Sequence, residues 1–274
     1  MGIQEALKTY EWREAPPADF AVIGDPIAHS FSPKMHAAAY AELGLEHKYL
    51  PIRVPSGEVP AAMDYLRTQG YKGVNVTVPH KGEVIGWLKE CDSFAVRVGS
   101  VNTVRLEDRY GFNTDAPAFM QTLELLNLTP GSPTLVLGAG GSARAIVAAL
   151  ADEGYPIRIW NRTRSRAEKL LQDLEIEGSV WDEPELLDAK LIVNTTSASR
   201  SGEHIPIQWE HAMAGAVAYD ISYNTDSNPF VADAEANGLR AIDGLGMLVM
   251  QGALSFEWWL GVDAPHSAMW EAVK

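Results

Sequence analysis

The sequence has few of the residues that build crosslinked, metal-clustered or membrane-spanning proteins. Its single cysteine, Cys91, has no partner for a disulfide within the chain and no second thiol for a zinc cluster. No apolar run approaches the roughly 20 residues that cross a bilayer, and the stretch from Met1 to Phe20 carries acidic side chains instead of the apolar core of a signal peptide. We therefore expect a cytoplasmic protein with neither a membrane anchor nor a structural metal.

Positive charge is also scarce. The chain has 22 Lys and Arg against 36 Asp and Glu, a formal net charge of −14. Nucleic acids are bound mainly by cations that neutralise their phosphates, so neither a nucleic acid nor a membrane surface is an expected partner. A small anionic molecule remains compatible with this composition if a few cations gather at one site.

The 274 residues, 46% of them hydrophobic, are enough for two domains. From Phe20 onward, short apolar runs alternate with amphipathic stretches, a pattern typical of βαβ units and mostly parallel sheets. We predict strands at residues 20–23, 49–54, 74–78, 103–106, 134–137, 157–160, 191–193 and 216–220. Between them we predict helices at residues 33–43, 59–69, 116–126, 143–153, 164–174 and 247–260.

The first 19 residues are expected to stay outside the core. They end in Ala15-Pro16-Pro17-Ala18, which is typical of an extended or disordered lead-in. Further on, Ser32 is the expected N-cap of a helix whose first position is Pro33. Turn-forming residues at 127–133 precede a dinucleotide-type strand, and we place the domain boundary near Asp115.

A glycine-rich motif follows the strand predicted at 134–137. It opens a helix of small residues, and a second strand comes about twenty residues later, as in dinucleotide-binding folds. Its glycines allow a sharp turn and a close approach to a pyrophosphate, which the helix N-terminus then binds. The candidate cofactor residues are Gly138, Ala139, Gly140, Gly141, Ser142 and Ala143.

The end of the second strand distinguishes between NAD and NADP. An NAD site has an acidic residue there, but this chain reads Asn161-Arg162-Thr163-Arg164-Ser165-Arg166. Guanidinium groups bind a 2′-phosphate through charge-assisted hydrogen bonds, so NADP is the predicted cofactor. The alternative is a solvated helix start, although positive charge in the first turn of a helix opposes its dipole.

Polar residues gather where the predicted strands of the first domain end. Ser30 and Ser32 lie in a loop that opens a helix. Asn75 and Thr77 lie on one face of another predicted strand, and Lys81 follows at the C-terminal end of that strand. Ligands of open α/β sheets bind at the carboxyl ends of strands. Each of these residues alone could be a turn former or a cap, so the hypothesis depends on the set.

The set resembles the shikimate dehydrogenase family in order and spacing, from about Phe20 to the C-terminal helix. The matching motifs are G-x-P-x-x-H-S-x-S-P, G-x-N-V-T-x-P-x-K, V-N-T, G-x-N-T-D, G-A-G-G-x-A, N-R-T-x-x-R-A and G-x-x-M-L-x-x-Q. The resemblance implies an α/β protein whose substrate-binding domain comprises residues 20–115 and 246–274, with residues 1–19 as an extension. A doubly wound, Rossmann-type NADP domain at 116–245 would lie between these segments, with the active site in the cleft between the domains.

The resemblance also implies roles for individual residues. The catalytic pair would be Lys81 and Asp115, with Lys81 giving a proton to the carbonyl oxygen as hydride reaches its carbon and Asp115 orienting Lys81. The substrate ligands would be Ser30, Ser32, Asn75, Thr77, Asn102, Gln251 and Tyr223, the two serines and the tyrosine near the carboxylate. The grip on the adenosine phosphate would be Asn161, Arg162, Thr163 and Arg166.

Two loops depart from the family pattern. Residues 194–200 lack the glycine and methionine of N-A-T-S-x-G-M, and residues 223–228 lack the proline of Y-x-P-x-x-T.

The expected activity is the NADP-dependent interconversion of 3-dehydroshikimate and shikimate, in a monomer or homodimer. The alternatives are a quinate/shikimate dehydrogenase, against which Ser32 argues because quinate enzymes often have threonine there, and a catalytically weak NADP-binding homologue.

Overall fold

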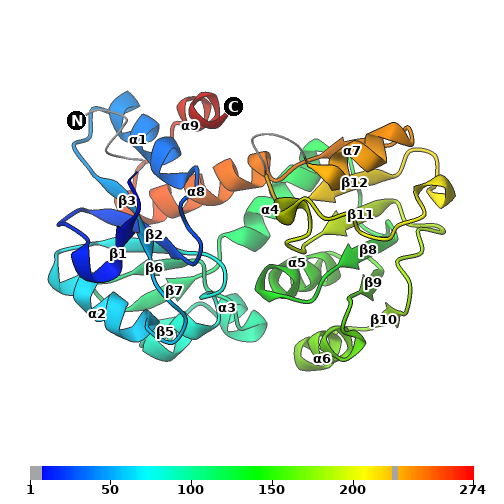
Figure 1. Cartoon of the computed structure of the whole chain (residues 1–274), viewed down its shortest axis with the longest axis horizontal. Helices are drawn as coiled ribbons and strands as arrows, with labels where there is room; N and C mark the ends of the chain where they lie inside the picture. Colours follow the sequence, from blue (N-terminus) through cyan, green and yellow to red (C-terminus); the bar gives the residue numbers. More distant parts are fainter. Residues whose placement is uncertain (1–7, 224–227) are drawn as a thin grey trace. The chain divides into compact units, whose positions relative to one another are not determined.

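The computed structural model describes residues 8–223 and 228–274, and the chain divides into two compact units. Unit 1 contains the chain up to Ala118 together with Leu248–Lys274, and unit 2 contains Phe119–Met247. The chain passes between the units within two helices, α4 (Asp115–Leu125) and α8 (Leu245–Leu260) (Figure 1). In the described ranges, no helix combines the length and the apolar character needed to cross a membrane.

Unit 1 contains a mixed sheet in which most strands are parallel. Strand β6 (Thr103–Arg105) is the exception, because it runs antiparallel to both of its neighbours, β4 (Gly73–Val76) and β7 (Tyr110–Phe112). The strands, in order across the sheet, are β1 (Tyr10–Glu11), β3 (Tyr49–Arg53), β2 (Phe20–Gly24), β4 (Gly73–Val76), β6 (Thr103–Arg105), β7 (Tyr110–Phe112) and β5 (Glu90–Cys91).

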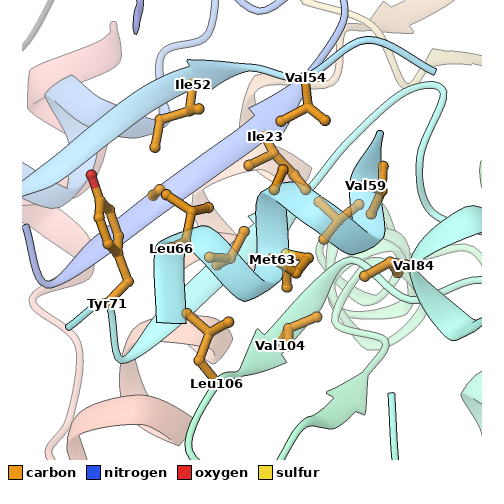
Figure 2. Close-up of a cluster of buried hydrophobic side chains, with 14 of the residues drawn as sticks. Ile23, Ile52, Val54, Val59, Met63, Leu66, Tyr71, Val84, Val104 and Leu106 are labelled. Carbon is orange, nitrogen blue, oxygen red and sulfur yellow. The ribbon is translucent and has the colours of Figure 1, made fainter. Parts of the chain in front are cut away.

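One face of this sheet is covered by α2 (Val59–Thr68). The apolar side of α2, including Met63 and Leu66, packs on alternate residues of the central strands such as Ile23 and Ile52 (Figure 2). The same cluster includes residues of the short helices η2 (Glu83–Trp87) and α3 (Ser93–Val98). Because side chains alternate along a strand, Asn75 and Thr103 point away from this apolar core.

The other face is covered by α1 (Ser32–Glu42) and α8, with α9 (His266–Val273) against α1. Aromatic rings fill this layer: Phe20 stacks on Trp259 and Tyr49 on His36, with centroids 4.8 Å and 4.2 Å apart. Gly252 of α8 lies so close to α1 that a Cβ there would be 2.1 Å from Cε of Met35. The terminal methyl of Met35 thus fills the space that a side chain at position 252 would take.

The N-terminal lead-in was predicted to stay outside the core, and this was wrong for residues 8–19. Strand β1 extends the sheet by pairing with β3, and η1 (Trp12–Glu14) turns Trp12 into the cluster under α2. Trp12 is 7% exposed and its Nε1 donates to Oε2 of Glu58 at 2.7 Å. Burial of the large indole of Trp12 stabilises the packing of this segment on the core, although Pro16 and Pro17 favour an extended chain. Residues 1–7 lie outside the described ranges.

Unit 2 contains a fully parallel sheet of the Rossmann type. Helices α5 (Gly141–Asp152) and α6 (Arg164–Leu174) lie on one side of it and α7 (Pro229–Ala236) on the other (Figure 1). The strands, in order, are β10 (Gly178–Trp181), β9 (Ile157–Trp160), β8 (Thr134–Leu137), β11 (Leu191–Asn194), β12 (Val217–Asp220) and β13 (Arg240–Ile242). The predicted α/β class and doubly wound second sheet are confirmed.

Candidate active site

Lys81 and Asp115, far apart in the sequence, meet in unit 1. Lys81 follows β4 and Asp115 is the first residue of α4, and their Nζ and Oδ2 atoms are 2.5 Å apart. The side chains are only 12% and 7% exposed, so solvent screens this ion pair weakly. The backbone carbonyl of Lys81 accepts from the N–H of Val101 at 2.9 Å, which ties the Lys81 loop to the segment before β6.

Asn102 joins this pair to Gln251. Its Nδ2 donates to Oδ1 of Asp115 at 2.9 Å and lies 3.4 Å from Oε1 of Gln251, while its Oδ1 accepts from the backbone N–H of Thr114 at 2.7 Å. Because a backbone N–H can only donate, this last bond fixes the orientation of the Asn102 amide. Gln251 is thus at the site, although it lies on a predominantly apolar helix.

Asn75 is buried beside this cluster. Its Oδ1 accepts from the hydroxyl of Tyr49 at 2.7 Å, and its Nδ2 donates to Oγ of Ser255 at 2.9 Å and to the carbonyl of Asn102 at 3.2 Å. Thr77 follows β4 and is half-buried. Tyr49 and Ser255 were not among the predicted site residues.

Ser30 and Ser32 lie next to each other at the start of α1. Ser30 is half-buried and Ser32 buried, and Oγ of Ser30 accepts from the backbone N–H of Ser32 at 3.3 Å. The prediction that Ser32 caps the helix was wrong, because Phe31 occupies the N-cap position and Ser32 is already helical. Capping therefore does not account for the Ser32 hydroxyl.

The glycine-rich loop of unit 2 joins β8 to α5. Gly138 has a φ of 111°, and a Cβ there would be 2.5 Å from Oγ1 of Thr195, so only glycine fits. Gly140 caps α5, and among the described residues no atom lies within 4 Å of where its Cβ would be. Gly141 is exposed and Ser142 half-buried in the first turn of the helix. This open, backbone-lined helix start fits a pyrophosphate.

The arginines after β9 differ in their surroundings. Arg164 is paired with Glu168 and Asp182, with nitrogen–oxygen distances of 2.7 Å in both cases. Arg162 and Arg166 are exposed, and neither has an ion pair with a described residue. Asn161 stabilises the turn by donating from Nδ2 to the carbonyl of Thr163 at 2.8 Å. Of the three arginines after β9, Arg162 and Arg166 are thus the two with no competing carboxylate in the part of the chain that the structure describes.

A buried cluster that the sequence analysis missed lies where β11 and β12 end. Asp220 accepts from Nδ2 of Asn194 at 2.9 Å, from the hydroxyl of Ser199 and from the backbone N–H of Ser222 at 2.7 Å. Burial raises the pKa of the Asp220 carboxyl, and these hydrogen bonds oppose that shift. The signal was a polar residue, Asn194 or Asp220, at the end of each of two otherwise apolar parallel strands.

The two loops that depart from the family pattern follow these strands. Residues 194–200 form a turn leading into η3 (Ser199–Ser201), and Oδ1 of Asn194 accepts from the backbone N–H and the hydroxyl of Thr196. In the second loop Tyr223 is half-buried. Residues 224–227 lie outside the described ranges.

Comparisons with known proteins agree with this geometry. The family model for the shikimate dehydrogenase substrate-binding domain matches residues 22–104, and that for the shikimate 5′-dehydrogenase C-terminal domain matches residues 244–274. A relative from Hyphomonas neptunium, named shikimate dehydrogenase (NADP(+)), is 42% identical over 248 residues, 88% of this chain and 91% of the relative.

Solved structures show the same similarity over both units. Shikimate 5-dehydrogenase of Thermus thermophilus, crystallised with NADP(H) and shikimate, is 38% identical with a TM-score of 0.85, covering 93% of this chain and 98% of that one. Shikimate dehydrogenase of Aquifex aeolicus is 33% identical with a TM-score of 0.87, covering 100% and 99%. As its motifs predicted, the chain belongs to the shikimate dehydrogenase family.

Proposed function

We propose that this chain is an NADP-dependent shikimate dehydrogenase. It catalyses the reversible, NADPH-dependent reduction of 3-dehydroshikimate to shikimate, which belongs to the chorismate route to aromatic amino acids. The observation that carries this proposal is the contact of Lys81 with Asp115, with Asn102 and Gln251 beside it. The names and bound ligands of the relatives support the same activity and cofactor.

The reaction needs a proton donor at the carbonyl oxygen. Bound NADPH supplies the hydride to the carbonyl carbon. Lys81, as the ammonium, then donates its proton to the oxygen as negative charge develops there, and in the oxidation direction its neutral amine takes the proton from the alcohol. Asp115 holds Nζ of Lys81 in place through the 2.5 Å contact, while Asn102 keeps the carboxylate oriented.

The other site residues bind and orient the two ligands. We assign the substrate carboxylate to Ser30, Ser32 and Tyr223, and the ring hydroxyls to Asn75, Thr77, Asn102, Asp115 and Gln251. The cofactor pyrophosphate is assigned to the loop from Gly138 to Ala143, and its 2′-phosphate to Asn161, Arg162, Thr163 and Arg166. The role of Tyr223 rests on the family resemblance alone.

Three further parts of the proposal concern the whole enzyme. Residues 20–115 and 246–274 form the substrate-binding domain, to whose sheet residues 8–19 contribute β1, and residues 116–245 form the NADP domain. The enzyme acts in the cytoplasm as a monomer or homodimer, and its mass in solution checks the oligomeric state.

A two-by-two assay tests the function. Purified protein is given shikimate or quinate with NADP or NAD, and cofactor reduction is followed by absorbance. With shikimate, we expect kcat/KM for NADP to exceed that for NAD by about ten-fold or more, since a charge-assisted bond to the 2′-phosphate contributes roughly 1.5–3 kcal/mol. With NADP, we expect shikimate to be oxidised in preference to quinate. Preference for quinate would establish the quinate enzyme instead, and no turnover with any combination would leave an NADP-binding homologue.

A further inference from the structure

Behind the proposed substrate ligands lies a buried network of hydroxyl and amide groups centred on Ser255. Ser255 is one helical turn beyond Gln251 on α8 and is fully buried. Its Oγ lies 2.9 Å from Nδ2 of Asn75, 2.8 Å from Oγ1 of Thr103 and 2.9 Å from the carbonyl oxygen of Gln251. It thus contacts a residue of β4, a residue of β6 and its own helix.

The direction of each hydrogen bond follows from what the atoms can do. The amide Nδ2 of Asn75 can only donate, and the carbonyl of Gln251 can only accept. The single hydroxyl proton of Ser255 therefore goes to Gln251, and Ser255 accepts from Asn75. Its contact with Thr103 must then be donated by the Thr103 hydroxyl, and its longer contact with Oγ1 of Thr114, at 3.4 Å, by the Thr114 hydroxyl. Ser255 makes all the hydrogen bonds that a hydroxyl can make.

The same reasoning extends the network to Asn102. The Oγ1 atom of Thr114 accepts from Nδ2 of Asn102 at 2.8 Å, and it lies 3.3 Å from Oγ1 of Thr103. Because the Thr103 proton is directed to Ser255 and the Ser255 proton to Gln251, the Thr114 hydroxyl is the donor toward both Thr103 and Ser255, at 3.3 Å and 3.4 Å. One directed chain therefore runs from the Asn102 amide through Thr114, Thr103 and Ser255 to the backbone of Gln251.

We propose that Ser255 is a positioning residue for the substrate, because its hydroxyl fixes the side-chain amides of Asn75 and Asn102 relative to Gln251. This inference rests on the proposed function, in which those three residues bind the ring hydroxyls. Ser255 does not contact the substrate in this scheme. Backbone groups already orient both amides, the N–H of Thr114 that of Asn102 and the carbonyl of Asn102 that of Asn75. Ser255 instead fixes where these amides lie relative to Gln251, and hence which pattern of hydroxyls the three residues bind.

Loss of the Ser255 hydroxyl should therefore weaken shikimate binding specifically. In Ser255→Ala, the Asn75 amide and the Thr103 hydroxyl keep their protons but lose an acceptor, and buried donors then turn to other partners. We expect KM for shikimate, and its calorimetric Kd, to rise roughly ten-fold while KM for NADP changes less than two-fold, since a net hydrogen bond or two is lost. Relative use of quinate should also shift.

Thr103 provides a matched pair of variants. Thr103→Val keeps the shape of the side chain but removes the hydroxyl, whereas Thr103→Ser keeps the hydroxyl in this fully buried position. We expect Thr103→Val to reproduce the rise in KM for shikimate and Thr103→Ser to stay within about two-fold of wild type. This pair also decides the matter if Ser255→Ala fails to fold.

A purely structural role would give a different result. Ala253→Gly, on the same helix and also buried, destabilises α8 without touching the network and should lower Tm while both KM values stay unchanged. If Ser255→Ala and Thr103→Val are active and, like Ala253→Gly, lower Tm without changing either KM, the inference is overturned and the proposed function stands. A wild type that neither binds nor oxidises shikimate would overturn both.

Discussion

Lys81 is the residue whose loss should affect the chemical step most. Its proton is needed as charge develops on the substrate oxygen, so Lys81→Ala should lower kcat by about a hundred- to ten-thousand-fold. The Kd for shikimate should change much less, because that charge is absent from the ground state. Stopped-flow turnover and calorimetry measure the two quantities.

The control for Lys81→Ala is another ion-paired lysine of unit 1. Lys72 contacts Asp19 at 2.9 Å but is 57% exposed and lies outside the proposed site. Lys72→Ala should leave kcat within about two-fold of wild type, because an exposed pair contributes little. Near-normal kcat in Lys81→Ala would remove this residue from the mechanism.

His36 makes the protein sensitive to acid. It is fully buried between aromatic rings, and neither ring nitrogen has a hydrogen-bond partner among the described residues. Burial lowers its pKa from the ordinary 6.5 to about 3. The unfolded chain therefore takes up a proton near pH 6.5 and the folded protein does not until about pH 3, so stability is lost as the pH falls through this range.

The expected size of this effect is about 2 kcal/mol between pH 7 and pH 5. Urea unfolding of wild type and His36→Phe at both pH values measures it, and the variant should lose about that much less stability on acidification. Tyr40→Phe in the same cluster is the control, because burial raises the pKa of the Tyr40 phenol and it stays neutral throughout. Parallel losses in wild type and His36→Phe would contradict the expectation.

Among individual residues, the sequence identified those that stand in recognisable motifs and missed those that position the motif residues. Lys81, Asp115 and Asn102 stand in short polar motifs at strand ends, where ligands of α/β proteins gather. Ser255 stands in an apolar helix, and Tyr49 and Thr103 resemble ordinary strand residues. Their roles depend on which strand residues face α8, and that register is set only when the sheet and helix pack together.

Among the elements, the turn from β9 into α6 should decide the cofactor preference. Arg162 and Arg166 are exposed without carboxylate partners among the described residues, so each is available to a 2′-phosphate. Arg162→Ala with Arg166→Ala should lower kcat/KM for NADP by about ten-fold or more and leave NAD turnover nearly unchanged. The wild-type preference should shrink as salt is added, because solvent-exposed charges are screened.

Arg164 offers the matched control on the same helix. Its guanidinium group is occupied by Glu168 and Asp182, so Arg164→Ala should shift the NADP to NAD ratio by less than about two-fold. Steady-state kinetics with both cofactors at two ionic strengths compares the variants. Equal use of NAD and NADP by the wild type would end the phosphate-grip explanation.

Elements with a clear apolar pattern were predictable, whereas several short elements that depend on tertiary contacts were not. The predicted strands and helices agree with the structure to within two residues at each end, and Arg164–Leu174 matches at both ends. Strands β1, β5, β7, β10 and β13 and helices α3, α7 and α9 were not predicted. Segments of two to eight residues such as these carry too few periods of hydrophobic alternation to be identified, and β1 depends on its pairing with β3.

For the whole molecule, the resemblance indicated that the first domain is interrupted, which periodicity alone did not. The compact units divide near Ala118 and Leu248, three or fewer residues from the expected positions at 115 and 246. Which unit binds which ligand remains a prediction, tested by the variants above. The altered loops after β11 and β12 could not be interpreted from the sequence, because no general rule relates them to the cofactor.

The interruption of unit 1 also sets an order of events on the ribosome. Unit 2 is continuous in sequence and can fold as soon as it emerges, since domains generally fold as units during synthesis. The sheet of unit 1 is made earlier, but α8 is translated only after unit 2. Until then, Asn75 and the aromatic rings on that face of the sheet lack their covering helix. Helix α8 thus brings Gln251 and Ser255 to Asn102 and Asn75 after unit 2 has been made, so a nascent chain holds Lys81 and Asp115 before the proposed substrate ligands are complete.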